Sequence, residues 1–411
     1  MFQRFRSLQQ EYPLQFWLMF WGMLISTTGS SMIWPFLMIY VSEKLSLPLV
    51  QIASLMTINA VMGLIFSFLS GPIADRVGRK GVMVISLAVN GVGYLFYSHA
   101  STFFVFAVVM ALNGAFSPLY RVGADSMMAD MIPADKRVDA YSLIRMSNNL
   151  GVALGPAIGG IIAILSYTTA FYIAAACMVT YSLLLLFYAR ETLQKQTQSH
   201  LIPERWGGYG HILRDKKFIS FVASFALTQI CSAMIWVLLS VYTKKNFNMP
   251  ENLYGLLPTT NAVMVVTLQL LITKYSKRYP PLWMLALGSL FYAVGVGSVA
   301  LGQGFWGFWV SMVILTIGEL ILVPTSTTYT ANLAPAEMRG RYMSMYTLTW
   351  GIGTAIGPIL GGYLNDNISP ASIWYGGLLI GLIGTGLFIH LASQTKLPER
   401  KAALSEDSLI H

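Results

Sequence analysis

The chain has 411 residues, of which 55% are hydrophobic and only 10% are charged, a balance that excludes an ordinary soluble globular domain. Its long apolar runs lack strict alternation, so they exclude a β-barrel and predict membrane-spanning helices. The formal net charge of +9 indicates attraction to an anionic membrane surface rather than to nucleic acid.

Apolar runs long enough to cross a bilayer recur along the chain and predict twelve transmembrane helices. The first run begins near Leu14 and lacks a short apolar core followed by a small-residue cleavage site, so we expect a retained helix rather than a signal peptide. The predicted spans centre on Ser26, Ala60, Asn90, Ser117, Leu150, Val179, Gln229, Met264, Phe291, Thr316, Gly351 and Leu382. The fold class that follows is an all-α integral membrane protein.

The longest polar stretch lies between the sixth and seventh predicted spans. It predicts two six-helix bundles, residues 1–189 and 217–395, joined by a cytoplasmic linker of residues 190–216. Residues 396–411 form the expected cytoplasmic tail.

The basic residues predict the orientation of the chain in the membrane. With both termini in the cytoplasm, 21 of the 26 Lys and Arg residues fall in cytoplasmic segments. Only Lys44, Lys244 and Lys245 then lie outside, while Arg121 and Arg145 lie within spans. Because basic residues are retained on the cytoplasmic side, we expect a multi-pass protein of the cell inner membrane with both termini cytoplasmic.

Motifs of enzymes and metal sites are not found in the sequence. Cys177 and Cys231 lie in apolar runs, where cysteine behaves as a small hydrophobe, and the five histidines have no metal-ligand spacing. No Ser/His/Asp grouping, zinc-protease motif or phosphate-binding loop occurs. We expect no catalytic residues, no metal and no cofactor other than a coupling proton.

Two segments that lie 202 residues apart are similar in sequence. Residues 133–160 read PADKRVDAYSLIRMSNNLGVALGPAIGG, and residues 335–362 read PAEMRGRYMSMYTLTWGIGTAIGPILGG. Their shared small residues include Gly151, Gly155, Pro156, Gly159 and Gly160 in the first copy and Gly357, Pro358 and Gly361 in the second. This spacing lets another helix approach closely, and proline weakens the helix. The pattern predicts parallel repeats, as in secondary transporters, whose glycines serve a bendable interface or plain packing.

The segment after the second span, GPIADRVGRK, concentrates charge and glycine in an otherwise apolar chain. With the G-x-x-x-G-P-x-x-G-G element of the fifth span and the twelve-helix plan, it resembles the major facilitator superfamily, particularly its twelve-helix drug:proton antiporters. The likeness runs from about Leu14 to Ala392. It implies two pseudo-symmetric six-helix bundles and transport by alternating access.

In that family, the charged element closes the cytoplasmic side of the outward-facing transporter. The resemblance implies that Asp75 meets the amino end of the eleventh span, near Gly340–Met343, and that Arg79 pairs with Asp130. A carboxylate is stabilised at a helix N-terminus, which supports this latch; alternatively, the charges only fix orientation. The expected latch residues are Gly71, Asp75, Arg76, Gly78, Arg79, Lys80 and Asp130.

The chain departs from the antiporter pattern in two places. Met110 stands where this branch commonly has an arginine, ahead of Asn113 and Gly114 in the fourth span. The first span has no acidic residue between Gln15 and Tyr40. The usual proton relay of the branch therefore does not transfer directly.

Four charged residues are predicted inside spans, where each costs about 2.5 to 3.5 kcal/mol unless it faces a cavity or a partner. Arg121 and Asp125 lie on one face of the fourth span, and Arg145 lies in the fifth. Asp125 forms either a structural pair with an arginine or part of a proton-coupling site. Glu319 has no basic neighbour on its own helix, so desolvation predicts a carboxyl that exchanges a proton. The alternative is that the Glu319 carboxyl stays protonated, hydrogen-bonds to another helix and never titrates.

Aromatic and amide side chains within the spans predict a substrate cavity. Together with methionines, such groups suit amphiphilic molecules of varied shape. Helix packing is the alternative role of the aromatic residues. The expected lining residues are Arg121, Arg145, Trp34, Asn59, Tyr120, Gln229, Trp236, Asn261 and Trp350.

The residues and the resemblance together favour a monomeric secondary transporter that exports lipophilic or amphiphilic compounds in exchange for protons. The first alternative is a transporter of an anionic metabolite or lysolipid that uses Arg121 and Arg145. The second is a multispanning sensor or membrane enzyme. The expected partners are a small-molecule substrate and the lipid bilayer, and no nucleic acid.

Overall fold

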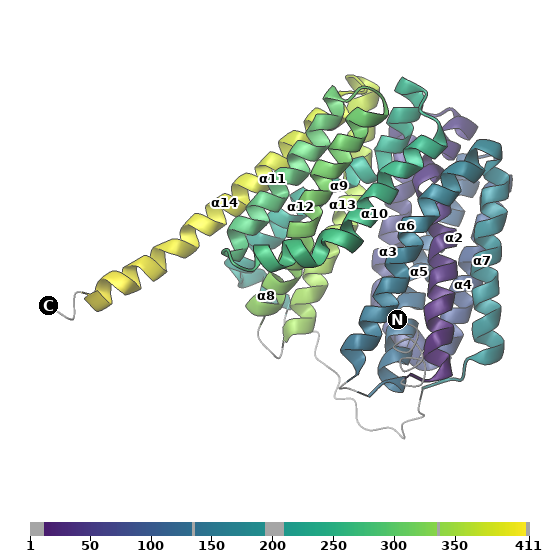
Figure 1. The fold of residues 1–411 in the computed structure, drawn as a ribbon, viewed down its shortest axis with the longest axis horizontal. Helices are drawn as coiled ribbons and strands as arrows, with labels where there is room; N and C mark the ends of the chain where they lie inside the picture. The colour runs from purple at the N-terminus through teal and green to yellow at the C-terminus, as the bar shows by residue number, and fades with distance from the viewer. Residues whose placement is uncertain (1–11, 134–135, 194–208, 335–337, 408–411) are drawn as a thin grey trace. The chain divides into compact units, whose positions relative to one another are not determined.

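The computed structural model describes residues 12–133, 136–193, 209–334 and 338–407, and this part of the chain contains helices without strands (Figure 1). The helices of the first half are α2 (Leu14–Leu45), α3 (Leu49–Val77), α4 (Arg79–His99), α5 (Phe103–Met131), α6 (Arg137–Leu165) and α7 (Tyr167–Tyr188). Those of the second half are α8 (Tyr209–Arg214), α9 (Lys216–Phe247), α10 (Glu251–Ser276), α11 (Pro281–Ser298), η1 (Val299–Leu301), α12 (Gly304–Leu333), α13 (Arg339–Asn367) and α14 (Ser372–Asp407).

Eleven of the described helices are long and apolar enough to cross a membrane. A hydrocarbon core of about 30 Å needs about 20 helical residues, because a helix rises about 1.5 Å per residue. The predicted eleventh span is present as α13, which has 29 residues. Helix α13 does not reach the required mean hydropathy, because it contains many glycine, threonine and asparagine residues. The predicted all-α membrane fold is confirmed.

The chain forms two compact units. The first contains residues 1–199 together with 237–263, and the second contains residues 200–236 together with 264–411. Helices α9 and α10 are therefore divided: the end of α9 and the start of α10 belong to the first unit. The predicted boundaries at residues 190–216 and 396–411 remain predictions. Much of that linker lies outside the described residues, and α14 continues as a helix to Asp407.

Each unit packs its helices in a corresponding way. In the first unit, α4 packs against both α5 and α7, and α2 packs against α6 and α7. In the second unit, α11 packs against both α12 and α14, and α13 packs against α14. The neighbours of α4 and α11 therefore match in chain order, as parallel repeats require.

The repeated glycines bring corresponding helices into backbone contact within each unit. A Cβ atom at Gly155 of α6 would lie 2.9 Å from the carbonyl oxygen of Thr28 on α2. One at Gly357 of α13 would lie 2.6 Å from the carbonyl oxygen of Ile230 on α9. Gly155 and Gly357 are 202 residues apart in the chain, and so are their neighbours Thr28 and Ile230. The repeat read from the sequence is thus also a repeat of helix contacts.

The small residues of α6 also contact the start of α10. A Cβ atom at Gly160 would lie 2.6 Å from the carbonyl oxygen of Glu251, and one at Gly255 would lie 2.5 Å from that of Pro156. The Thr259 hydroxyl donates a hydrogen bond of 3.3 Å to the carbonyl of Ala153. The first unit therefore packs two helices, α2 and α10, closely against α6.

Candidate functional site

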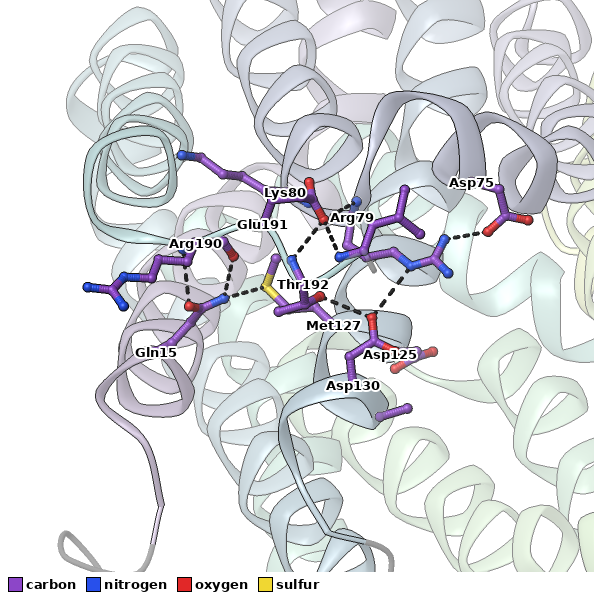
Figure 2. Close-up of polar contacts among 12 residues, drawn as sticks. Gln15, Asp75, Arg79, Lys80, Asp125, Met127, Asp130, Arg190, Glu191 and Thr192 are labelled. Atoms are coloured by element: carbon purple, nitrogen blue, oxygen red, sulfur yellow. Dashed lines mark hydrogen bonds and ion pairs between the residues drawn. The ribbon is translucent and has the colours of Figure 1, made fainter. Parts of the chain in front are cut away.

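The charged segment predicted as a latch lies at the turn between α3 and α4 (Figure 2). Helix α3 ends at Val77, and α4 begins at Arg79. Gly78 joins them with φ 95° and ψ 156°, a conformation that is essentially restricted to glycine because it has no Cβ. The glycine fixes the angle between the two helices.

Arg79 holds two carboxylates together. Its guanidinium lies 2.5 Å from Asp75, one turn earlier on α3, and 3.7 Å from Asp130 near the end of α5 (Figure 2). The side chain of Arg79 is only 16% exposed, whereas that of Asp75 is 65% exposed. The contact that the resemblance implied between Arg79 and Asp130 is thus present in the structure.

Glu191, which follows α7, is the centre of the polar contacts in this region. Its carboxylate accepts hydrogen bonds from the backbone N–H groups of Arg79 at 3.0 Å and Lys80 at 3.1 Å (Figure 2). It also accepts from the N–H groups of Thr192 and Leu193, both at 2.9 Å. A carboxylate at this place satisfies two of the free N–H groups at the start of α4 and offsets the basic residues of its first turn.

Two further contacts attach the segment after α7 to the rest of the unit. The Thr192 hydroxyl donates a hydrogen bond of 3.0 Å to Asp130. The Gln15 side chain on α2 donates to the carbonyl of Arg190 at 2.9 Å and accepts from its N–H at 3.1 Å (Figure 2). Helices α2, α3, α4, α5 and the end of α7 are therefore connected by one polar network.

The remaining latch residues differ in their surroundings. Arg76 is exposed, Lys80 is half-buried, and a Cβ atom at Gly71 would meet no atom within 4 Å. The expected contact of Asp75 with Gly340–Met343 joins residues of different units, so it stays a prediction.

A cavity in the first unit brings together three of the residues predicted to bind substrate or protons. Arg121 and Asp125 are both exposed on α5, and Tyr120 lies beside them. Arg121 interacts electrostatically with Asp125. The other lining residues are Met19, Met23, Ala124, Met128, Tyr141 and Ile144. The cavity is thus apolar, with one pair of opposite charges.

The tyrosines of this region are fixed by hydrogen bonds. The Tyr120 hydroxyl lies 3.2 Å from that of Tyr181 on α7, and it donates to the sulfur of Met23 at 3.8 Å. The Tyr141 hydroxyl donates to the carbonyl of Asp125 at 2.9 Å. These bonds hold the aromatic walls of the cavity, and the methionines supply unbranched apolar side chains beside them.

Glu319, the predicted proton-coupling residue, is half-buried on α12 in the second unit. The residue before it, Gly318, packs on α11: a Cβ atom there would lie 2.8 Å from the carbonyl oxygen of Gly288. Tyr292 of α11 lies within electrostatic range of the Glu319 carboxyl. The carboxyl therefore sits beside a closely packed pair of helices.

The other predicted cavity residues occupy several environments. The Asn59 amide donates to the carbonyl of Met110 at 3.0 Å, joining α3 to the place on α5 where the family pattern has arginine. Gln229 is buried, and its amide nitrogen has no hydrogen-bond partner among the described residues. Trp350 is 39% exposed and makes an edge contact with Phe225.

Four further predicted residues do not line the cavity beside Arg121. Trp34 and Arg145 are exposed, Trp236 is half-buried and Asn261 is buried. The predicted cavity residues are divided between the two units, so a cavity that they all share stays a prediction.

The sequence reasoning missed an ion cluster that lies where α2 and α9 end and where α7 and α10 begin. Lys244 of α9 lies 2.8 Å from Glu251 and 3.9 Å from Glu43 at the end of α2. The Tyr167 hydroxyl at the start of α7 donates to Glu251 at 2.8 Å. The Glu251 side chain is only 7% exposed, so its charge depends on these partners. The cluster fastens the start of α10 to α2, α7 and α9 within the first unit.

Glu191 was also missed by the sequence reasoning. Its position directly after the sixth predicted span, on the same predicted side as Gly78, is the available signal. For Glu251, the signal is an acid that follows a basic pair and opens a helix. Neither pattern is specific, because the partners are distant in the chain. Tyr167 lies more than 80 residues before Glu251, and Arg79 lies more than 100 residues before Glu191.

Comparisons with known proteins extend these observations. The chain matches the Major Facilitator Superfamily profile over residues 19–242 and 221–409. It is 26% identical to a Na(+), Li(+), K(+)/H(+) antiporter of Planococcus maritimus, over 86% of this chain and 88% of that protein. It is 22% identical to the quinolone resistance protein NorA of Staphylococcus aureus (strain N315), over 96% of this chain and 99% of that protein.

Solved transporter structures share the fold. The nucleoside transporter NupG matches 93% of this chain and 100% of its own with a TM-score of 0.78 at 14% identity. A peptide transporter POT, solved in complex with sulfate, matches 92% of this chain and 95% of its own with a TM-score of 0.75 at 18% identity. The profile match covers nearly all of the described helices. The chain belongs to the Major Facilitator Superfamily and is a multi-pass membrane transporter.

Proposed function

We propose that the protein is a proton-coupled exporter of lipophilic or amphiphilic compounds. The observation that carries this proposal is the cavity of the first unit, in which methionines and tyrosines surround Arg121 and Asp125. Methionine and aromatic side chains accept apolar groups of varied shape, and a few polar groups orient the ligand. The similarity to a protein named for quinolone resistance supports compounds of this kind.

Glu319 is the proposed coupling residue. A carboxyl within a span is costly when charged and uncompensated, so it favours protonation when its surroundings are dry and release when they are wet. Alternating access changes these surroundings in each cycle. Asp125 is the second candidate, because it faces the cavity and is balanced by Arg121. Protonation of Asp125 would leave Arg121 unbalanced, which would alter the cavity for the next ligand.

The buried amide nitrogen of Gln229, which has no hydrogen-bond partner in the described part of the chain, supports a binding role for the second unit. Buried polar groups normally have hydrogen-bond partners, and an exception calls for an explanation. In this proposal the amide donates to a polar group of the substrate during part of the cycle.

The Asp75, Arg79 and Asp130 cluster is the proposed cytoplasmic latch. Arg79 contacts both carboxylates, and the side chain of Asp75 is mostly exposed, so a second partner can also reach it. The amino end of α13 is the proposed partner, because a helix N-terminus attracts a carboxylate.

The experiment uses purified protein in proteoliposomes that contain a pH-sensitive dye. An uncharged amphiphilic compound is added to one set, and a carboxylated metabolite of similar size is added to another. The proposal predicts proton movement with the uncharged amphiphile but not with the metabolite, and Arg121→Ala is expected to lower the transport of the amphiphile by less than about ten-fold, because one charged contact contributes about 1 kcal/mol. Loss of anion transport alone in Arg121→Ala would instead favour the anionic substrate.

A second candidate function is exchange of monovalent cations for protons, which the similarity to the Planococcus antiporter supports. The same proteoliposomes distinguish it. Proton movement on addition of Na⁺ or K⁺ alone, without any organic compound, would establish cation exchange.

A further inference from the structure

A second cavity lies between α9 and α14 in the second unit, at the end where both predicted spans stop. Helix α9 begins at Lys216, and the part of α14 that is apolar enough to cross a membrane extends to Gln394 among the residues whose side chains are described. The residues that carry the argument are Lys216, Lys217, Ser220, Leu387, His390 and Gln394, all of which line the cavity. The opening therefore combines polar groups and apolar walls at a membrane boundary.

The cavity has a positive charge that no acidic residue among its lining residues balances. Lys216 and Lys217 occupy the first turn of α9, where the helix dipole disfavours cations. Both are exposed, and neither forms an ion pair with an acidic side chain in the described part of the chain. The adjacent Asp215 is engaged elsewhere, since it accepts from the Phe218 N–H at 3.1 Å and from the Tyr342 hydroxyl at 2.9 Å.

The wall on α14 carries polar groups and leucines along one face. The Gln394 amide lies 2.9 Å from the His390 ring, so both polar groups are next to each other at the outer end. Leu387, one turn deeper in the predicted span, is 40% exposed. A ligand with an anionic head and an apolar tail matches this order of groups.

The internal repeat shows what fills the corresponding place in the first unit. Gln15 of α2 lies 202 residues before Lys217, and its amide forms hydrogen bonds with both backbone groups of Arg190. There, the chain leaves α7 after Tyr188 and covers the start of α2. In the second unit, α14 instead continues as a helix past Gln394. In the first unit, the backbone after α7 fills this position. In the second unit, the corresponding position is the open, basic cavity between α9 and α14.

We propose that the cavity between α9 and α14 binds the headgroup of an anionic phospholipid. Lys216 and Lys217 contact the phosphate, Ser220 and Gln394 donate hydrogen bonds to the headgroup, and an acyl chain follows Leu387 into the bilayer. The charge of the two lysines selects anionic over zwitterionic lipids, because each lysine near a headgroup favours a negative charge.

The test is native mass spectrometry of the full chain in detergent, titrated separately with short-chain phosphatidylglycerol and with phosphatidylcholine of equal chain length. The unchanged protein is expected to bind phosphatidylglycerol at least about ten-fold more tightly. The double variant Lys216→Gln/Lys217→Gln is expected to lose about ten-fold or more of this affinity, whereas Lys216→Arg/Lys217→Arg retains it.

The matched control is Lys274→Gln/Lys277→Gln, which removes two exposed lysines on the same predicted side but away from the cavity. It is expected to bind phosphatidylglycerol like the unchanged protein. Melting curves without lipid check that all variants are folded. Equal affinity for the two lipids, or an equal loss in both Gln variants, would overturn the proposal. Competition by inorganic phosphate at matching concentration would also overturn it, in favour of a soluble anion.

Discussion

Gly78 determines how the chain turns from α3 into α4. Its positive φ disfavours any side chain, and a Cβ atom there would collide with the Glu191 carboxylate. We expect Gly78→Ala to destabilise the protein by about 2 kcal/mol, with a lower melting temperature in detergent. Gly71→Ala is the control from the same motif, because its Cβ would meet no atom within 4 Å and alanine favours a helix by about 0.5–1 kcal/mol. Equal melting temperatures for both variants would contradict this account.

Asp75 tests whether the charged turn does more than fix orientation. The side chain is 65% exposed, so Asp75→Asn should leave folding and topology unchanged. If Asp75 is part of a latch, the variant should slow substrate transport several-fold while substrate affinity is retained. Transport at the normal rate would leave the cluster as an orientation signal only.

Single residues also show which parts of the site could be predicted. The family resemblance implied the pairing of Arg79 with Asp130, and the structure places them 3.7 Å apart. Glu191 could not be predicted in the same way, because its partners depend on where the chain lies after α7. The Asn59 contact with Met110 was likewise hidden, since an amide within a span fits a substrate cavity and a helix contact equally well.

At the scale of helices, the start of α10 is fastened by charge as well as by close packing. Lys244→Gln is expected to destabilise the protein by about 2 kcal/mol, because it leaves the buried Glu251 carboxylate with less compensation. Lys245→Gln is the control, since Lys245 is exposed and its replacement removes the same charge. Thermal melting of the two variants in detergent should separate them, and equal melting temperatures would count against the ion cluster.

The helix repeat was predictable because its signal is local. Glycine spacing in two segments gave an offset of 202 residues, and the contacts of Gly155 and Gly357 follow the same offset on α2 and α9. By contrast, the division of α9 and α10 between two compact units was not predictable. It depends on distant contacts such as that of Gly160 with Glu251, which no local pattern encodes.

For the whole molecule, hydropathy alone was sufficient for the all-helical membrane fold, because a bilayer leaves the backbone few alternatives. Eleven described helices meet the requirements of a span, and the family profile and solved structures share the arrangement. Specific function follows less directly. Relatives named for drug resistance and for cation exchange have similar levels of identity to this chain, so only the chemistry of its own cavity and carboxyl groups distinguishes them.

In the proposed function, transport is coupled to protons through Glu319. The most direct measurement is the internal pH of proteoliposomes when an amphiphilic quinolone is added, compared between the unchanged protein, Glu319→Gln and the control Glu43→Gln, whose carboxyl lies at the end of α2. We predict quinolone-dependent proton movement in the unchanged protein and in Glu43→Gln, and at least about a ten-fold loss in Glu319→Gln, with quinolone binding retained. Undiminished proton movement in Glu319→Gln, or proton movement that does not depend on the quinolone, would contradict the account.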